Sequence, residues 1–134
     1  MQIELSKRGD YAVRAVLDLA QRAGSGRRKA REIAATTAVP PKFLPQILAA
    51  LVQGGVVEAM AGRHGGYRLT RPAAEISLLD VIRAVEAPAS PRACLLWGRN
   101  CSELQRCAVH DAWSAAQEAL NAQLAVTRFA DLLS

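Results

Sequence analysis

The apolar positions in the first half of the chain follow helical spacing in three segments. The first segment is 10–23, whose apolar residues share one face of a helix of 3.6 residues per turn. These residues are Ala12, Ala15, Val16, Leu19, Ala20 and Ala23. A shorter helix is expected over Ala30–Thr37. The third begins at Pro41, since proline suits the first helical turn, and ends at Gly54-Gly55.

The third helix divides into an apolar stripe and a polar face. The stripe consists of Phe43, Leu44, Ile47, Leu48, Leu51 and Val52, and the opposite face carries Lys42, Gln46, Ala49 and Gln53. Two short strands, 56–60 and 66–70, are expected next, around a glycine-rich turn. Helix, short helix, tight turn, helix and basic hairpin is the order of a winged helix-turn-helix. The predicted fold class is therefore mainly α with a small β hairpin.

The second half predicts two further helices. Ser77 is a suitable N-cap for a helix over 78–86, and a long helix is expected from about 104 to 126. The apolar stripe of the long helix consists of Val109, Ala112, Trp113, Ala116, Leu120 and Leu124. The rest of so short a chain is too small to bury this stripe. We therefore expect a homodimer in which the stripes of two copies pack together. Residues 1–72 would form the DNA-binding region and 73–134 the remainder of one compact domain.

Charge is distributed unevenly between these halves. The formal net charge is +5, but residues 1–72 hold twelve Lys or Arg against five Asp or Glu, and residues 73–134 hold five against seven. A basic half favours a polyanionic partner, here double-stranded DNA. Lys42 and Gln46 would reach base edges in the major groove, and Arg63 would lie at the hairpin tip. The expected phosphate contacts are Arg27, Arg28, Lys29 and Arg31. The alternative is a winged helix used for protein contacts.

All three cysteines lie within fourteen positions, at Cys94, Cys101 and Cys107, and His110 follows closely. The odd count and the absence of a secretory or membrane segment argue against disulfides and favour a reducing cytoplasm. Structural zinc ligands usually lie two to four residues apart, whereas iron–sulfur sites accept wider gaps. On a helix Cys107 and His110 would share a face. The pattern predicts an iron–sulfur cluster with two or four irons, held by these four residues.

Other interpretations of the cysteines remain open at this point. Zinc binding or cluster-free thiol chemistry would also use clustered cysteines, and free cysteines also pack as small buried hydrophobic residues. A redox enzyme with a nucleophilic cysteine is a further alternative, but the chain has no Cys-x-x-Cys pair and no cofactor loop. We therefore expect a regulator and not an enzyme.

Several motifs resemble the Rrf-two family of bacterial repressors, which includes IscR-like and NsrR-like members. The resemblance rests on Leu5–Ala20, on Pro40–Leu44 with Gln46–Leu48, on the run Gly-Arg-His-Gly-Gly-Tyr-Arg-Leu at 62–69, and on the cysteine triplet. It covers nearly the whole chain. It implies a homodimeric winged-helix transcription regulator, in many members one whose iron–sulfur cluster reports redox state, nitric oxide or iron–sulfur status.

The resemblance also implies cluster ligands. The three cysteines match the family's cluster cysteines, His110 falls where IscR-like members place a histidine, and Asp10 falls where NsrR-like members place an aspartate from the partner subunit. We favour His110, because an aspartate in the first turn of a helix is already explained by the helix dipole. Two departures affect this comparison: the first cysteine gap is six residues instead of five, and Pro45 stands where a polar base reader is found.

Overall fold

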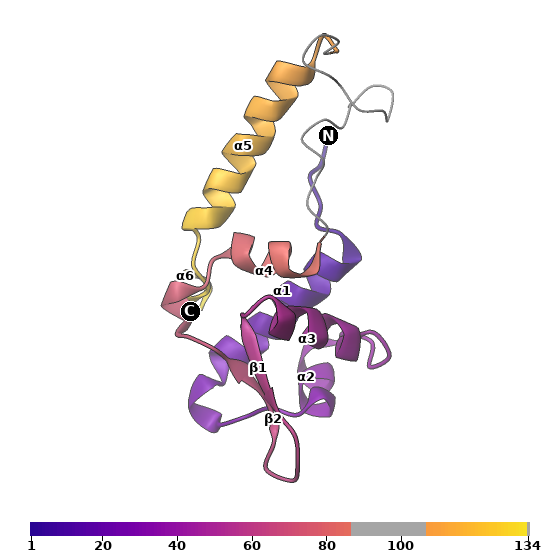
Figure 1. Cartoon of the computed structure of the whole chain (residues 1–134), viewed down its shortest axis with the longest axis vertical. Helices are drawn as coiled ribbons and strands as arrows, with labels where there is room; N and C mark the ends of the chain where they lie inside the picture. The colour runs from indigo at the N-terminus through magenta and orange to yellow at the C-terminus, as the bar shows by residue number, and fades with distance from the viewer. Residues whose placement is uncertain (87–106, 134) are drawn as a thin grey trace.

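The computed structural model describes residues 1–86 and 107–133. Figure 1 shows a helical body from which a small hairpin and one long helix project. The elements, in chain order, are α1 Lys7–Gln21, α2 Ala30–Thr37, α3 Leu44–Gln53, β1 Val57–Met60, β2 Gly66–Leu69, α4 Leu78–Val85, α5 His110–Val126 and α6 Phe129–Leu132. Short 3-10 turns lie at Ala23–Ser25 and Ala73–Glu75. The predicted winged helix-turn-helix is confirmed.

Helix α1 starts earlier than its apolar pattern predicts. The Ser6 hydroxyl accepts a hydrogen bond from the Gly9 N–H at 3.1 Å and caps the helix. The helix therefore includes Lys7, Arg8 and Gly9, which precede the predicted start at residue 10. The helix ends at Gln21 and not at residue 23, because the chain tightens into the 3-10 turn that follows. Helix α2 has the predicted bounds.

The turn between α2 and α3 is built from backbone geometry. Ala38 ends α2 in the left-handed region with φ of 60°, and Ala38 N–H donates to Ala34 C=O at 3.2 Å. The next residues form a turn in which Phe43 N–H donates to Pro40 C=O at 3.0 Å. Helix α3 therefore begins at Leu44, three residues after the predicted start at Pro41.

The hairpin pairs β1 with β2 in antiparallel register, from Val57 opposite Leu69 to Met60 opposite Gly66. Strand β2 also has a second backbone neighbour. Arg28 N–H donates to Tyr67 C=O at 2.8 Å, and Tyr67 N–H donates to Arg28 C=O at 2.7 Å. Gly66 is required here, since a Cβ on it would lie 2.6 Å from the Arg28 carbonyl oxygen. The wing is thus fastened to the segment that precedes α2.

The core lies where α1, α2, α3, α4 and the base of the hairpin meet. Its fully buried side chains include Val16, Ile33, Leu44, Leu48, Leu51, Val56, Val57, Val81 and Phe129. Phe129 belongs to α6, a four-residue helix that the sequence pattern does not predict. Its N–H donates to Ile76 C=O at 2.9 Å, and Leu78 N–H donates to Thr127 C=O at 3.0 Å. The chain after α5 therefore returns to the body and fixes the base of that helix.

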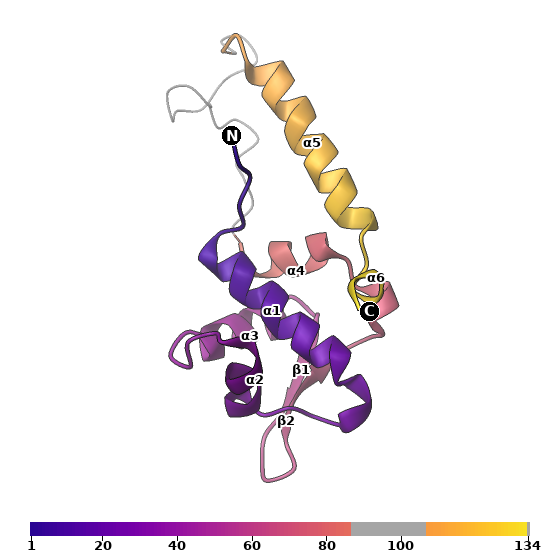
Figure 2. The same ribbon diagram turned by 180° about the vertical axis from the view of Figure 1, so that it is seen from behind.

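Helix α5 extends away from the body, as Figures 1 and 2 show from opposite sides. None of its residues is buried, and Trp113 is 42% exposed. It begins at His110, so the prediction of a helix from about 104 is wrong for residues 107–109, which lie in a turn before it. The start of the predicted range, 104–106, lies outside the described residues. No described helix is long and apolar enough to cross a membrane.

Candidate DNA-binding surface and cysteine region

The turn before α3 and the first turn of the helix present polar side chains to solvent. Lys42 and Gln46 are exposed, while Leu44 and Ile47, on the other side of the same turn, are buried in the core. This anchoring fixes the orientation of the helix. The apolar-stripe prediction is wrong at Phe43 and Val52, which are 40% and 36% exposed. The buried stripe is therefore narrower than predicted and consists of Leu44, Ile47, Leu48 and Leu51.

The tip of the hairpin is the second exposed basic element. Arg63 and His64 are both exposed in the turn between β1 and β2. Gly62, with φ of 102°, allows this turn, and its carbonyl accepts a hydrogen bond from Lys29 Nζ at 3.2 Å. Lys29 therefore joins the start of α2 to the wing tip, and this contact sets the wing's position relative to the helix-turn-helix.

Acidic side chains neutralise part of the wing's charge. The Glu58 carboxylate accepts hydrogen bonds from Arg68 and, at 3.3 Å, from Arg27. The Arg68 hydrogen bond and charge, with a smaller contribution from Arg27, hold the pKa of Glu58 below its usual value. Glu58 is therefore ionised at neutral pH, and Arg68 is not an isolated cation.

Arg28 is held inside the fold by Asp18, a buried carboxylate of α1. The Arg28 guanidinium donates to both Asp18 oxygens, each at 3.2 Å, and the Arg28 side chain is only 13% exposed. Asp18 also accepts from Arg22 at 2.9 Å and from the Thr36 hydroxyl. We call Asp18, Arg22, Arg28 and Thr36 the Asp18 cluster. It ties α1 to α2 and, through the Arg28 backbone, to the wing.

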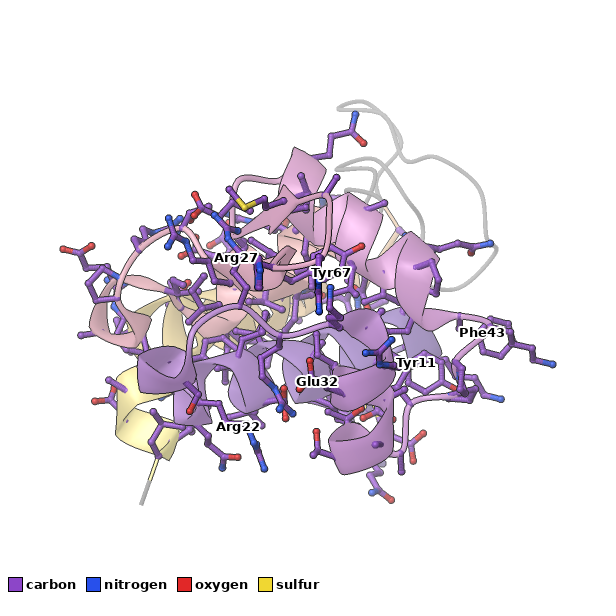
Figure 3. The ribbon with its side chains drawn as sticks, turned by 90° about the horizontal axis from the view of Figure 1, so that it is seen from below. Tyr11, Arg22, Arg27, Glu32, Phe43 and Tyr67 are labelled. Atoms are coloured by element: carbon purple, nitrogen blue, oxygen red, sulfur yellow. The ribbon has the colours of Figure 1, made fainter. Side chains whose placement is uncertain are left out.

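Arg27 is likewise part of the structure, with a side chain 15% exposed and one guanidinium nitrogen buried. Figure 3 shows Arg27 beside Tyr67 and β2, on the face that includes the hairpin. Arg31, by contrast, is exposed on α2 and forms no ion pair within the described part of the chain. Of the arginines predicted to contact phosphate, Arg31 and Arg63 are thus the accessible ones.

The cysteine region is described only from Cys107 onward, and Cys94 and Cys101 lie outside the described residues. Cys107 and His110 are both partly buried, and His110 N–H donates to Cys107 C=O at 3.1 Å. The expectation that they share a helical face is wrong, because Cys107 precedes α5. They are instead adjacent through a turn. Within 1–86 and 107–133, no three His, Cys, Asp or Glu side chains are grouped to hold a metal.

Asp10, the alternative ligand, lies in the first turn of α1. Its carboxylate accepts from Arg14 at 2.8 and 3.3 Å, and both side chains are nearly half exposed. The start of α1 is also fastened to the end of α4. Ser6 Oγ donates to the Glu86 carboxylate, and Arg8 Nε donates to Val85 C=O at 2.8 Å. Residue 86 is the last described residue before the segment that carries Cys94 and Cys101.

A winged helix-turn-helix with Lys42 and Gln46 exposed at the start of the recognition helix, and Arg63 exposed at the wing tip, is typical of DNA-binding transcription regulators. Among known families, the Rrf2 family, described as iron-dependent transcriptional regulators, matches residues 5–134 of this chain. The chain belongs to the Rrf2 family. A helix-turn-helix transcriptional regulator of Mycobacterium tuberculosis is 34% identical over 130 residues, which cover 97% of this chain and 81% of that protein.

Two solved structures are similar over the whole fold. IscR of T. potens has a TM-score of 0.79 at 27% identity, covering 98% of this chain and 87% of its own. CymR of B. subtilis, the global cysteine regulator, has a TM-score of 0.78 at 26% identity, covering 98% of this chain and 96% of its own. These relatives are transcription regulators and not enzymes.

Proposed function

We propose that this Rrf2-family regulator is a homodimer in the cytoplasm whose affinity for operator DNA depends on an iron–sulfur cluster. Cys94, Cys101 and Cys107 would bind the cluster, with His110 as the fourth ligand. The observation that carries the proposal is the cysteine triplet in a chain whose family is described as iron-dependent. Thiolate and imidazole are donors that iron–sulfur clusters accept.

The described ligands fit this donor set. Cys107 and His110 are brought together by the turn that opens α5, and neither is fully buried. Asp10 is engaged by Arg14, although an exposed pair of this kind is worth only about 0–1 kcal/mol and could be exchanged for another partner. When bound, the cluster would supply a group that reacts with oxidants or nitric oxide. Asp10 remains the alternative fourth ligand.

Contacts of the described residues join the end of α4, which precedes the cysteine segment in sequence, to the DNA-binding surface. The bonds of Ser6 and Arg8 join α1 to the end of α4, and α1 packs directly against α3. A displacement of Glu86 would therefore move the start of α1, and with it the recognition helix. This is how a change at the cysteines would alter DNA affinity.

On DNA, Lys42 and Gln46 would reach base edges while Arg31 and Arg63 would contact phosphates or the minor groove. Gln46→Ala should relax sequence preference, and Arg63→Ala should weaken binding to all duplexes alike. Gln117→Ala and Arg83→Ala are matched controls, since both residues are exposed and lie on α5 and α4, outside the helix-turn-helix and the wing. Binding should weaken steeply with salt. Affinity that is equal at low and high salt would contradict this assignment.

The proposed dimer joins through Trp113, Ala116, Leu120 and Leu124 of α5, together with Val109, the residue just before the helix. Trp113 is 42% exposed in the single chain, so covering it would add apolar burial without rebuilding the fold. Trp113→Glu should give monomers in sedimentation experiments, whereas Ala122→Glu, an exposed change on the opposite face of α5, should not. Wild-type protein that sediments as a monomer at micromolar concentration would rule the dimer out.

The cluster is tested by anaerobic purification with an absorption spectrum and iron and sulfide analysis. Each of Cys94→Ser, Cys101→Ser and Cys107→Ser should abolish the colour, because few strong ligands would remain. His110→Ala should alter the spectrum and Asp10→Ala should change little. If Asp10→Ala destroys the cluster and His110→Ala spares it, the aspartate arrangement is the correct one.

The second candidate is a regulator that uses its thiols or zinc without a cluster. The similarity to CymR, the global cysteine regulator, favours it, since that fold is matched as closely as IscR. Protein made anaerobically with ample iron that contains only zinc, or no metal, would support this candidate over the first.

A further inference from the structure

Phe43 is an exposed aromatic residue at a position where the apolar pattern predicts core. It is the N-cap residue of α3 and is 40% exposed, whereas Leu44 and Ile47 beside it are buried. An exposed phenylalanine has no favourable contact with water. In sequence it stands between the exposed Lys42 and Gln46, the residues proposed to read base edges.

Two neighbours hold the Phe43 ring in place. Tyr11 of α1 stacks on it, with ring centroids 6.0 Å apart and an angle of 18° between the planes. The ammonium group of Lys42 lies over the ring, 4.9 Å from its centroid. Figure 3 shows Phe43 at the edge of the molecule and Tyr11 nearer the body. The ring is therefore supported by a rigid helix and still offers free apolar surface.

The major groove presents one prominent apolar group, the 5-methyl of thymine, and phenylalanine is among the side chains that contact it. A protein partner would need a larger apolar surface than a single ring flanked by lysine and glutamine. The adjacent Lys42 charge favours DNA over most proteins. We propose that Phe43 reads a thymine methyl group in the operator, with Tyr11 as the residue that positions its ring.

This inference rests on the proposed placement of α3 in the major groove, and uracil substitution tests it. A duplex is first selected by the wild-type protein from a random-sequence library, and each thymine is then replaced in turn by uracil, which removes only the methyl group. Wild-type protein should bind at least one substituted duplex about fourfold more weakly, the effect expected for one buried methyl group. Phe43→Ala should bind the thymine and uracil duplexes equally.

Two further variants distinguish loss of the thymine contact from a general effect on the structure of α3. Val52→Ala removes another exposed apolar side chain of α3 and should keep the wild-type ratio of thymine to uracil affinity. Tyr11→Leu keeps apolar bulk beside Phe43 but removes the stacked ring, and it should lower the ratio. A wild-type ratio in Tyr11→Leu would remove Tyr11 from the proposal.

The outcomes distinguish this inference from the function on which it rests. If wild-type protein selects no duplex, the assignment of α3 as the recognition helix fails. If it selects a duplex but no thymine-to-uracil change weakens binding, or if Phe43→Ala keeps the same ratio, only the thymine contact is overturned.

Discussion

Replacing Asp18 by alanine should destabilise the protein more than any exposed charge change on the same helix. The Asp18 side chain is 2% exposed and accepts hydrogen bonds from Arg28, Arg22 and Thr36. Its removal leaves the Arg28 guanidinium, 13% exposed, without its main carboxylate partner. Leaving one partner of a buried pair uncompensated typically costs about 3–5 kcal/mol.

We expect a value at the lower end, near 3 kcal/mol, because Arg22 is 37% exposed and can turn to water. For a domain of this size, that loss lowers the melting temperature by about 10 °C. Since total stabilities are about 5–15 kcal/mol, the variant should remain folded at room temperature. Because Arg28 also pairs with Tyr67, the wing should lose order and operator affinity should fall.

The assay is thermal unfolding followed by circular dichroism, on metal-free protein. Asp10→Ala is the matched control, since Asp10 pairs with Arg14 at the same helical spacing in α1 but both side chains are exposed. It should cost less than about 1 kcal/mol. If Asp18→Ala and Asp10→Ala lower the melting temperature by similar amounts, the reasoning from burial is refuted.

Three other substitutions, one of them with a control, test further features of the fold. Ala38→Gly should leave stability unchanged or raise it by up to about 1 kcal/mol in thermal unfolding, because Ala38 has φ of 60°, and a clear loss would contradict this. Phe129→Ala should cost about 3–5 kcal/mol, since its side chain is fully buried, whereas Val126→Ala, 66% exposed, should cost less than about 0.5 kcal/mol. Burial raises the pKa of Asp80, but Ser77 and Arg71 outweigh this and hold that pKa below its usual value. Their contacts therefore add stability above about pH 4 that is lost as pH falls further, so in acid titrations Asp80→Asn should lose less stability below pH 4 than the wild type.

The sequence predicts the order of helices and strands because strong breakers separate its periodic segments. Helix α2 has the expected bounds, and each strand of the hairpin is one residue shorter than expected. The glycines at 54–55 precede β1, and those at 65–66 stand at the start of β2. Helix α6 is missed because four residues show no periodicity, and its stability comes from the burial of Phe129 in a distant core. The spacing of apolar residues within a short segment carries no information about contacts with residues far away in sequence.

In the candidate site, too, the sequence predicts local exposure but not contacts between distant residues. The exposure of Lys42, Gln46 and Arg63 follows from their place opposite the apolar stripe or at a turn. Arg28 lies in a basic run that suggests phosphate contact, yet its partner Asp18 is ten residues earlier, in α1. A stacked pair such as Tyr11 and Phe43, from α1 and the start of α3, is equally invisible to sequence periodicity.

The central claim, that the cysteine region controls DNA binding, is tested most directly by one comparison of affinities. A single anaerobic preparation is measured against its selected duplex before and after removal of iron, at one fixed salt concentration. The two forms should differ between about fivefold and 150-fold, as allosteric coupling between two sites usually gives, and Cys107→Ser should show no difference. Equal affinity of the iron-containing and iron-free forms would contradict the account.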